Sequence, residues 1–226
     1  MYALARPDGR YRRGLLEGLP KTEYFVLATH ERLAGLSTHV AADLRTLTVS
    51  VREHPVLTCD LGAAQGRAAA EAFFARVLDC PDGTTPVVAR EPGRKFTDAA
   101  VQGDLGMEAI SVINLASVRD LAERIGTPLD PLRFRGNLYW DGLPPFAEDS
   151  LVGSEITIGE CTFQALARIP RCAATEVAPG DGRRDLRVPR LMVHHYGHSQ
   201  MGIYLQVRTG GTLHEHDPIT MAMANA

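Results

Sequence analysis

The 226-residue sequence contains almost no lysine. Lys21 and Lys95 are the only two among its 24 Lys and Arg side chains, so nearly all of the positive charge is carried by arginine. The formal net charge is −3, and the chain has neither a basic tail nor a long run of one sign. Such a chain has no general attraction for nucleic acid or for an anionic membrane, and we expect neither as a partner. Only arginines in particular positions therefore suggest anion binding, through the planar guanidinium.

Cysteine and long apolar runs are also scarce. The four cysteines (Cys59, Cys80, Cys161 and Cys172) are too few for a disulfide scaffold, and no two form a C-x-x-C pair. The opening MYALARPDGRYRR has no apolar signal core, and no stretch approaches the ~20 apolar residues of a membrane-spanning helix. We therefore expect a packed protein in a reducing, cytoplasmic compartment.

The common nucleotide and hydrolase signatures are missing from the sequence. It contains no G-x-x-x-x-G-K-[ST], no G-x-G-x-x-G and no G-x-S-x-G motif. This disfavours a P-loop enzyme, a Rossmann enzyme and a serine hydrolase. A cysteine is the best remaining anchor for a site.

The first part of the chain mixes helix and strand patterns. Its most regular segment is 66–80, where Phe73, Phe74, Val77 and Leu78 recur at helical spacing. The other expected elements are strands at 23–28 and 46–51, a short helix at 29–36 opened by Thr29, and a Pro/Gly-rich loop at 81–98.

The second part of the chain has mainly β patterns. After a strand at 109–115 we expect a helix at 116–126, with Ser117 as N-cap and Gly126 as terminator. The remaining expected elements are a strand from 133 to 140, a hairpin over 154–169 that turns at 159–160, and a second hairpin from 202 to 221 that turns at 210–211.

Short strands, glycine turns and few long helices predict an α+β, mainly β protein. The expected architecture is a closed or nearly closed β-barrel with peripheral helices. No repeat and no long linker divides the chain. We predict an N-terminal α/β region over 1–95 and the β-barrel domain over 96–226.

Cys172 lies in the stretch RIPRCAATEV, directly after an alternating strand. Pro170 lacks the N–H that a sheet ladder needs, so the strand should end there. Strand ends of barrels commonly carry sites, and Arg171 would favour the thiolate, the form that attacks and binds metals. Free cysteine is also among the most buried residue types, so a structural and a reactive interpretation both stay open. The other three cysteines are expected in the core.

Arginine and asparagine alternate in RFRGN, at residues 133–137. On an extended strand, Arg133, Arg135 and Asn137 would face the same side and could grip a phosphate or a polar ring edge. A solvated strand face paired with the acidic 146–150 segment is the alternative, and it stays open. The arginine-rich stretch 181–190 is either an anion-contacting flap or a polar surface loop, and we favour the loop.

Three histidines cluster in HHYGH, at His194, His195 and His198. Adjacent residues on a strand point to opposite faces, so His194 and His195 would not share one metal ion. No HExxH pattern accompanies them, and we do not expect a zinc site. His198 is expected to anchor a loop or line a pocket.

The order of the motifs resembles one family. FTD, SVINLASVRDL, LDPLRFRGNLYWDGLPPFAEDSLVG, ITIGE, IPRCAATEV, YGHSQMGIY and GGTLHEHDPI follow one another from about Phe96 to Thr220. This series resembles the MOSC family, the molybdenum cofactor sulfurase C-terminal domain. The preceding part resembles a shortened form of the β-rich N-terminal region found in many single-chain bacterial members and in the amidoxime-reducing component.

The resemblance implies a β-barrel with Cys172 as its signature residue. In molybdenum-binding relatives this cysteine ligates the metal of the pterin cofactor, and in sulfurase-linked relatives it is thought to carry a persulfide. Arg135 and Asn137 match the family's R-x-N strand, which contacts the pterin and its phosphate. With Arg171 beside the thiolate, these residues form the predicted cofactor-binding set. Pyridoxal phosphate belongs to a domain fused to MOSC in eukaryotic sulfurases, and we do not expect it here.

Three functions are therefore expected from the sequence. The first is a molybdenum-cofactor oxidoreductase that acts on small substrates, such as N-hydroxylated compounds, with electrons from a separate partner. The second is a sulfur carrier that takes a persulfide onto Cys172 from a cysteine desulfurase. The third is a barrel that only binds a ligand or partner.

Overall fold

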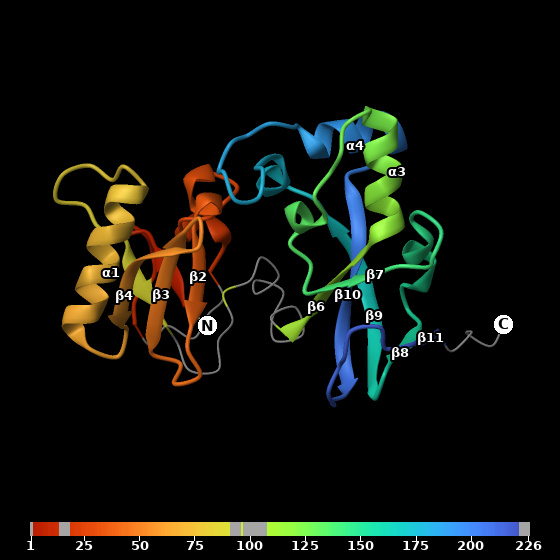
Figure 1. The fold of residues 1–226 in the computed structure, drawn as a ribbon, viewed down its shortest axis with the longest axis horizontal. Helices are drawn as coiled ribbons and strands as arrows, with labels where there is room; N and C mark the ends of the chain where they lie inside the picture. Colours follow the sequence, from red (N-terminus) through yellow and green to blue (C-terminus); the bar gives the residue numbers. More distant parts are fainter. Residues whose placement is uncertain (1, 14–18, 91–95, 97–107, 222–226) are drawn as a thin grey trace. The chain divides into compact units, whose positions relative to one another are not determined.

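A computed structural model describes residues 2–13, 19–90, 96 and 108–221 of the chain (Figure 1). The chain divides into two compact units, and residues 176–186 belong to the first although they fall within the predicted barrel domain. The first unit is Met1–Met107 with Glu176–Leu186, and the second is Glu108–Thr175 with Arg187–Ala226. None of the described helices is long and apolar enough to span a membrane.

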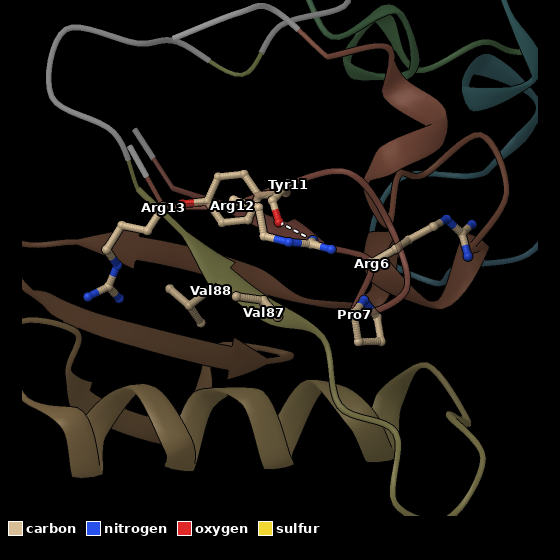
Figure 2. Close-up of a pocket in the computed structure, with 7 residues that line it drawn as sticks. All are labelled: Arg6, Pro7, Tyr11, Arg12, Arg13, Val87 and Val88. Atoms are coloured by element: carbon tan, nitrogen blue, oxygen red, sulfur yellow. Dashed lines mark hydrogen bonds between the residues drawn. The ribbon is translucent and has the colours of Figure 1, made fainter. Parts of the chain in front are cut away.

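The first unit combines two small antiparallel sheets with one long helix. Its described elements are β1 (Ala3–Ala5) paired with β5 (Val87–Ala89), the sheet β2 (Ser37–Val40), β3 (Thr46–Val51) and β4 (His54–Asp60), the helix α1 (Ala64–Val77), and the 3-10 turns η1 (Lys21–Glu23) and η2 (Glu31–Gly35). Leu47 and Val49 of β3 pack with Ala70 and Phe74 of α1 in a shared core. A pocket lies between β5 and the chain that follows β1 (Figure 2).

Two of the four elements predicted in this unit are confirmed, and two are wrong. The strand at 46–51 is β3, and the helix at 66–80 is α1. The segment 23–28 forms no strand, because only Tyr24 bridges Ala5 in an isolated pair. The helix at 29–36 is only a 3-10 turn, since the Thr29 hydroxyl contacts His30 Nδ1 and Val26 O and caps nothing. The predicted loop at 81–98 contains the short strand β5, and its residues 91–95, 97 and 98 lie outside the described residues.

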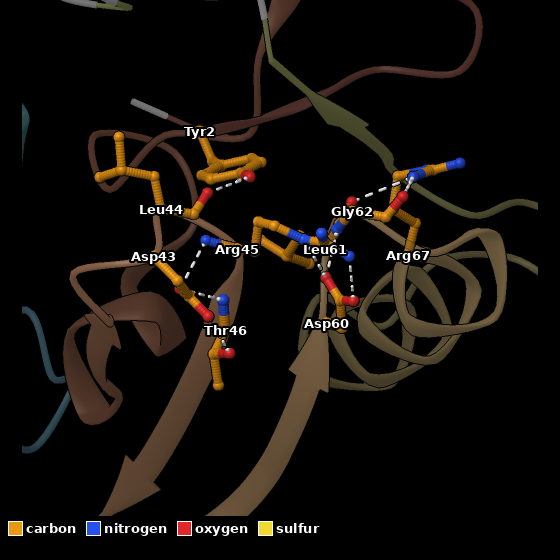
Figure 3. A network of polar contacts seen from close by, with 9 residues as sticks. All are labelled: Tyr2, Asp43, Leu44, Arg45, Thr46, Asp60, Leu61, Gly62 and Arg67. Carbon is orange, nitrogen blue, oxygen red and sulfur yellow. Dashed lines mark hydrogen bonds and ion pairs between the residues drawn. The ribbon is translucent and has the colours of Figure 1, made fainter.

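Charged side chains form hydrogen bonds where β3 begins and β4 ends, at the open end of the β3–β4 hairpin (Figure 3). The Asp43 carboxylate accepts hydrogen bonds from the backbone N–H groups of Arg45 (2.8 Å) and Thr46 (2.9 Å). The Arg45 guanidinium binds both oxygens of Asp60 at 3.1 and 2.5 Å. The hydrogen bonds to Thr46 lower the pKa of Asp43 to about 2. Ionised Asp43 therefore fixes the turn that leads into β3.

The second unit contains one sheet of six described strands, in the order β11-β8-β9-β10-β6-β7. Its elements are β6 (Ile110–Asn114), α3 (Leu115–Ile125), η4 (Pro131–Phe134), β7 (Leu138–Trp140), η5 (Ala147–Leu151), β8 (Glu155–Ile158), β9 (Cys161–Pro170), η6 (Ala173–Glu176), α4 (Val188–Tyr196), β10 (Gln200–Thr209) and β11 (Ile219–Met221). Long strands β9 and β10 lie side by side (Figure 1), and the sheet curls into a half-barrel. The fold is α+β and mainly β, as predicted.

Hydrogen-bonding capacity decides where the last strand goes. The predicted hairpin over 154–169 is confirmed as β8 and β9, with Ile158 opposite Cys161. The predicted hairpin over 202–221 is wrong, because β11 pairs with β8, with Ile219 opposite Ile158. Strand β10 is bonded to β9 along one edge and, over Ile203–Leu205, to β6 along the other, and β11 lies at the far end of the sheet beside β8.

Helix α3 connects the parallel strands β6 and β7, which need such a crossover. It begins at Leu115, because the Asn114 side chain accepts the Ala116 N–H at 3.0 Å and caps the helix. The predicted N-cap, Ser117, lies instead inside the helix and is buried. Gly126 ends the helix as predicted, with a left-handed φ of 64°.

A fully buried carboxylate fastens η5 to the start of α3. Glu148 accepts hydrogen bonds from Asn114 Nδ2 (2.8 Å) and Ser117 Oγ (3.1 Å), and Ser117 Oγ itself accepts the Phe146 N–H at 2.9 Å. A buried charge is tolerated only when such partners replace water. The occupied Ser117 hydroxyl explains why this residue is not the N-cap.

The first testable prediction concerns Asp43. Because its pKa is lowered from the ordinary value of about 4 to about 2, the ionised carboxylate stabilises the folded state at every pH above about 4. This stabilisation is lost as the pH falls from about 4 to about 2. We expect Asp43→Ala to lower the melting temperature at pH 7, and the deficit to vanish toward pH 2. Asp82→Ala, at an exposed turn, is the matched control, and an equal deficit at both pH values would contradict the prediction.

Candidate functional site

Cys172 lies just beyond the end of β9, where the sequence predicts it. Strand β9 ends at Pro170, and Arg171 and Cys172 lead into the turn η6. The backbone carbonyl of Cys172 accepts hydrogen bonds from the Thr175 N–H (3.0 Å) and the Thr175 hydroxyl (2.8 Å). These two bonds fix the backbone of the residue that carries the thiol. The side chain is a free, half-buried thiol.

The other cysteines lie in different surroundings. Cys161 is buried in the core of the second unit. Cys59 packs against the core of the first unit, and burial raises the pKa of its thiol and that of Cys80. A raised pKa disfavours the reactive thiolate at neutral pH. Only Cys172 combines partial exposure with an adjacent arginine that is itself half-buried and hydrogen-bonded.

Arg171 joins three segments of the second unit. Its Nε and Nη2 donate to Met201 O, with Nε at 2.8 Å, and its Nη1 donates to Phe134 O at 2.9 Å. Its backbone N–H donates to Ser199 O at 2.8 Å. Burial lowers the pKa of the guanidinium to about 10, which leaves it charged at neutral pH. All three of its nitrogens are thus used to fix the chain beside Cys172.

The lack of a side chain at Gly202 leaves space for the Arg171 guanidinium and for the carbonyl of Val112. Gly202 has a φ of 77°, and a Cβ there would stand 2.3 Å from Val112 O and 3.2 Å from Arg171 Nη2. The sequence did not point to Phe134, Met201 or Gly202, because each contributes through its backbone. A backbone acceptor leaves no signal in the side-chain pattern.

The predicted row of Arg133, Arg135 and Asn137 does not form, because this segment is not a strand. The Asp130 carboxylate accepts the Leu132 N–H at 2.8 Å, and Pro131 follows it, so a 3-10 turn begins here. Arg133 is buried, and its Nη1 donates to Thr175 O at 3.1 Å. The alternative, pairing with the acidic 146–150 segment, is not found for Arg135 or Asn137 among the described contacts.

Arg135 and Asn137 remain exposed next to the segment that Arg171 binds. Arg135 has a left-handed φ of 52°, and no described residue bonds its guanidinium. Asn137 uses its Oδ1 to accept the N–H (2.9 Å) and hydroxyl (2.8 Å) of Ser111. Its Nδ2 bonds no described group. These two side chains therefore keep donors that an anionic or polar ligand could use.

His194 and His195 lie on a helix and not on a strand, and His198 lies in the loop that follows. Pro189 in the first turn favours a helix, and α4 carries His194 and His195 in its last turn. His198 accepts the Gln200 N–H at 3.2 Å and stacks on Tyr196, so it anchors this loop as expected. Within the described part of the chain, no three His, Cys, Asp or Glu side chains are placed to hold a metal ion together.

The arginine-rich stretch 181–190 is a loop up to Arg187, and its residues Val188–Arg190 begin α4. Arg184 pairs with Glu31 and Glu176, each at 3.4 Å, and donates to Ala28 O at 2.7 Å. These contacts lie within the first unit. They fit an anchored surface loop better than a free flap.

The curled sheet and its connections define the class of the second unit as an α+β half-barrel domain. The family model described as the MOSC domain matches residues 94–220, which is more than half of the chain. The chain therefore belongs to the MOSC domain family.

Solved structures give only a distant similarity to this chain. The crystal structure of YiiM from Geobacillus stearothermophilus shares 19% sequence identity with it, at a TM-score of 0.40. The match covers 50% of this chain and 53% of that one, so the chain spans about half the length of that protein. A similarity this low carries no argument about function. No curated protein matches the chain.

The second prediction tests the role of Arg171. Replacing it with Ala leaves the carbonyls of Phe134 and Met201 without their charged donor, so we expect a loss of about 1.5–3 kcal/mol in the free energy of unfolding. Arg171→Lys should recover only part of this, since one ammonium group does not reproduce the three-nitrogen fork. Denaturant titration measures both losses.

Arg208→Ala is the matched control, because Arg208 is exposed on β10. This change should stay within about 0.5 kcal/mol of the unchanged protein. If Arg171→Ala unfolds at the same denaturant concentration as the unchanged protein, the positioning role is wrong.

Proposed function

We propose that the second unit binds a molybdenum–pterin cofactor, with the Cys172 thiolate as the protein ligand of the metal. The observation that carries this proposal is the placement of a free, half-buried thiol at the end of β9, beside a half-buried arginine whose guanidinium donates to Phe134 O. Membership of the MOSC family, which is associated with this cofactor, supports it.

The side chains around Cys172 suit such a group. A pterin cofactor presents an anionic phosphate and polar ring edges, and both need hydrogen-bond donors. Arg135 has an unengaged guanidinium, and Asn137 has an unengaged Nδ2, among the described contacts. A guanidinium binds phosphate through parallel hydrogen bonds, and an amide N–H₂ donates to a ring carbonyl or nitrogen. In this proposal Arg135 and Asn137 bind the cofactor.

Arg171 acts in this proposal chiefly by position. Its hydrogen bonds to Phe134 O and Met201 O fix the 134–137 segment relative to Cys172. Its positive charge next to Cys172 also favours the thiolate over the thiol. A direct contact between Arg171 and the cofactor stays a prediction.

The bound cofactor would supply two-electron chemistry, such as reduction or oxygen-atom transfer on a small substrate. N-hydroxylated compounds, as in the amidoxime-reducing component, are the substrate class that we propose. A separate protein partner would deliver the electrons. The residues of this chain would hold and orient the cofactor, and a reducing, cytoplasmic setting would keep Cys172 available.

The third prediction concerns cofactor retention. Protein purified from a host that makes the cofactor should contain molybdenum and show pterin fluorescence, and Cys172→Ala should lose the molybdenum because its only proposed protein ligand is gone. Cys80→Ala should retain it, since Cys80 lies in the first unit. Elemental analysis and fluorescence measure the two components. Unchanged protein that is free of metal and pterin would contradict the proposal.

Asn137→Asp sharpens this experiment. An aspartate keeps the oxygen that accepts the Ser111 N–H and hydroxyl, but it removes the Nδ2 donor and adds a negative charge. We expect lower pterin content at an unchanged melting temperature. A fall in both would mean that Asn137 acts only in the structure.

A sulfur-carrier role is the second candidate, and the partial exposure of the Cys172 thiol favours it. The thiolate would attack the terminal sulfur of a persulfide on a cysteine desulfurase. A new S–S bond forms on Cys172, and the donor cysteine leaves as its thiolate.

The fourth prediction tests this alternative. After incubation with a cysteine desulfurase and cysteine, mass spectrometry should show an adduct of about 32 Da, one sulfur atom, on Cys172. Cys172→Ala should show no adduct, and Cys80→Ala should show it unchanged. If the unchanged protein gains no such mass, the carrier role is wrong.

A further inference from the structure

The first unit contains a pocket that neither the sequence motifs nor the proposed cofactor site use. It has a volume of about 250 Å³ and lies between β5 and the chain from Arg6 to Arg13. Figure 2 shows Val87 and Val88 of β5 on one side of it and Arg12 and Tyr11 across from them. Arg6 and Pro7 stand toward one end, and Arg13 stands toward the other.

The pocket lining is cationic. Three of its seven lining residues are arginine, namely Arg6, Arg12 and Arg13, and none is acidic. Among the described residues, none of these three arginines forms an ion pair. The nearby carboxylate of Glu23 is already occupied, because it accepts hydrogen bonds from Arg10 N (2.5 Å) and Arg10 Nε (3.3 Å). No described carboxylate is therefore paired with an arginine of the pocket lining.

Two of these arginines are held in place without using all of their donors. Arg12 Nη1 donates to the carbonyls of Gly9 and Tyr11, both at 2.7 Å, which leaves Nε and Nη2. Arg6 Nε donates to Thr22 O at 2.9 Å, and its guanidinium lies 4.9 Å from the centre of the Phe25 ring. Both Nη groups of Arg6 then remain as donors for a ligand. Side chains fixed in advance lose less entropy when a ligand binds.

We propose that this pocket binds a small organic anion, a phosphate or carboxylate joined to a short apolar group. The arginines supply the charge-assisted hydrogen bonds that such an anion needs. Val87, which is 37% exposed, and Pro7 supply an apolar wall. The volume is below the 300–1,000 Å³ of typical drug-sized sites, which restricts the ligand to a small molecule.

The fifth prediction uses phenyl phosphate as a probe of the full-length, metal-free protein. Calorimetric titration should show saturable binding at one site. Benzyl alcohol, which has the ring without the charge, should not bind measurably at about 10 mM, and inorganic phosphate should bind more weakly than phenyl phosphate. Benzoate in place of phenyl phosphate tests whether the site prefers a carboxylate.

Variants assign the binding to this pocket. Arg12→Ala should weaken phenyl phosphate binding about tenfold, the change expected for one lost charged hydrogen bond. Arg13→Glu should abolish it, because the charge is reversed at an exposed side chain that has no described contact. Arg76→Ala on α1 removes an exposed arginine elsewhere in the first unit and should leave binding unchanged.

Melting temperatures establish that each variant is folded. If Arg12→Ala does not fold, Arg13→Glu still tests the proposal. No saturable binding of either phenyl phosphate or benzoate would overturn the proposal. So would equal affinity of the unchanged protein and Arg13→Glu, or equal binding of benzyl alcohol. The measurement needs no molybdenum and no Cys172, so its failure would leave the cofactor proposal untouched.

Discussion

The hydrogen bonds from Arg171 to the carbonyls of Phe134 and Met201 are the interaction on which the candidate site depends. A half-buried guanidinium needs acceptors for the N–H groups that lose contact with water, and here the acceptors come from two segments far from Arg171 in the sequence. Three parts of the chain are thereby fixed at one point. Cys172 follows Arg171 directly, and Arg135 follows Phe134, so the same contact sets the positions of the thiol and of the exposed guanidinium.

The need to satisfy polar groups also shapes the rest of the second unit. Strand β10 pairs with β9 and, over Ile203–Leu205, with β6, and the last strand pairs with β8 at the end of the sheet. Glu148 is fully buried because Asn114 and Ser117 meet its carboxylate. Those bonds decide which residue caps α3. The fold around Cys172 is thus set by where donors and acceptors can be paired.

Arginine has two roles in this chain, one structural and one in proposed ligand binding. The number of arginines alone therefore does not indicate whether the chain binds an anion. Arg45 and Arg171 are bound to a carboxylate or to backbone carbonyls, and they hold structure. Arg12 and Arg135 keep donors that no described group takes. One guanidinium has five N–H groups, so a side chain such as Arg12 can be anchored and still offer donors to a ligand. This second group supplies the proposed contacts to the cofactor phosphate and to a small anion.

The sequence by itself determined the features that depend on local pattern. These were the strand at 46–51, the helix at 66–80, the hairpin over 154–169, the Gly126 terminator and the position of Cys172 after a strand end. The order of motifs also resembled the MOSC family, which the family model then showed. Tertiary structure decided the rest. RFRGN looked like an alternating strand, but the Asp130–Pro131 pair starts a 3-10 turn there, and Arg133 turns inward to Thr175. The partner of β11 and the acceptors of Arg171 depend on edges and carbonyls brought together only by folding, and a backbone group has no side-chain signal in the sequence.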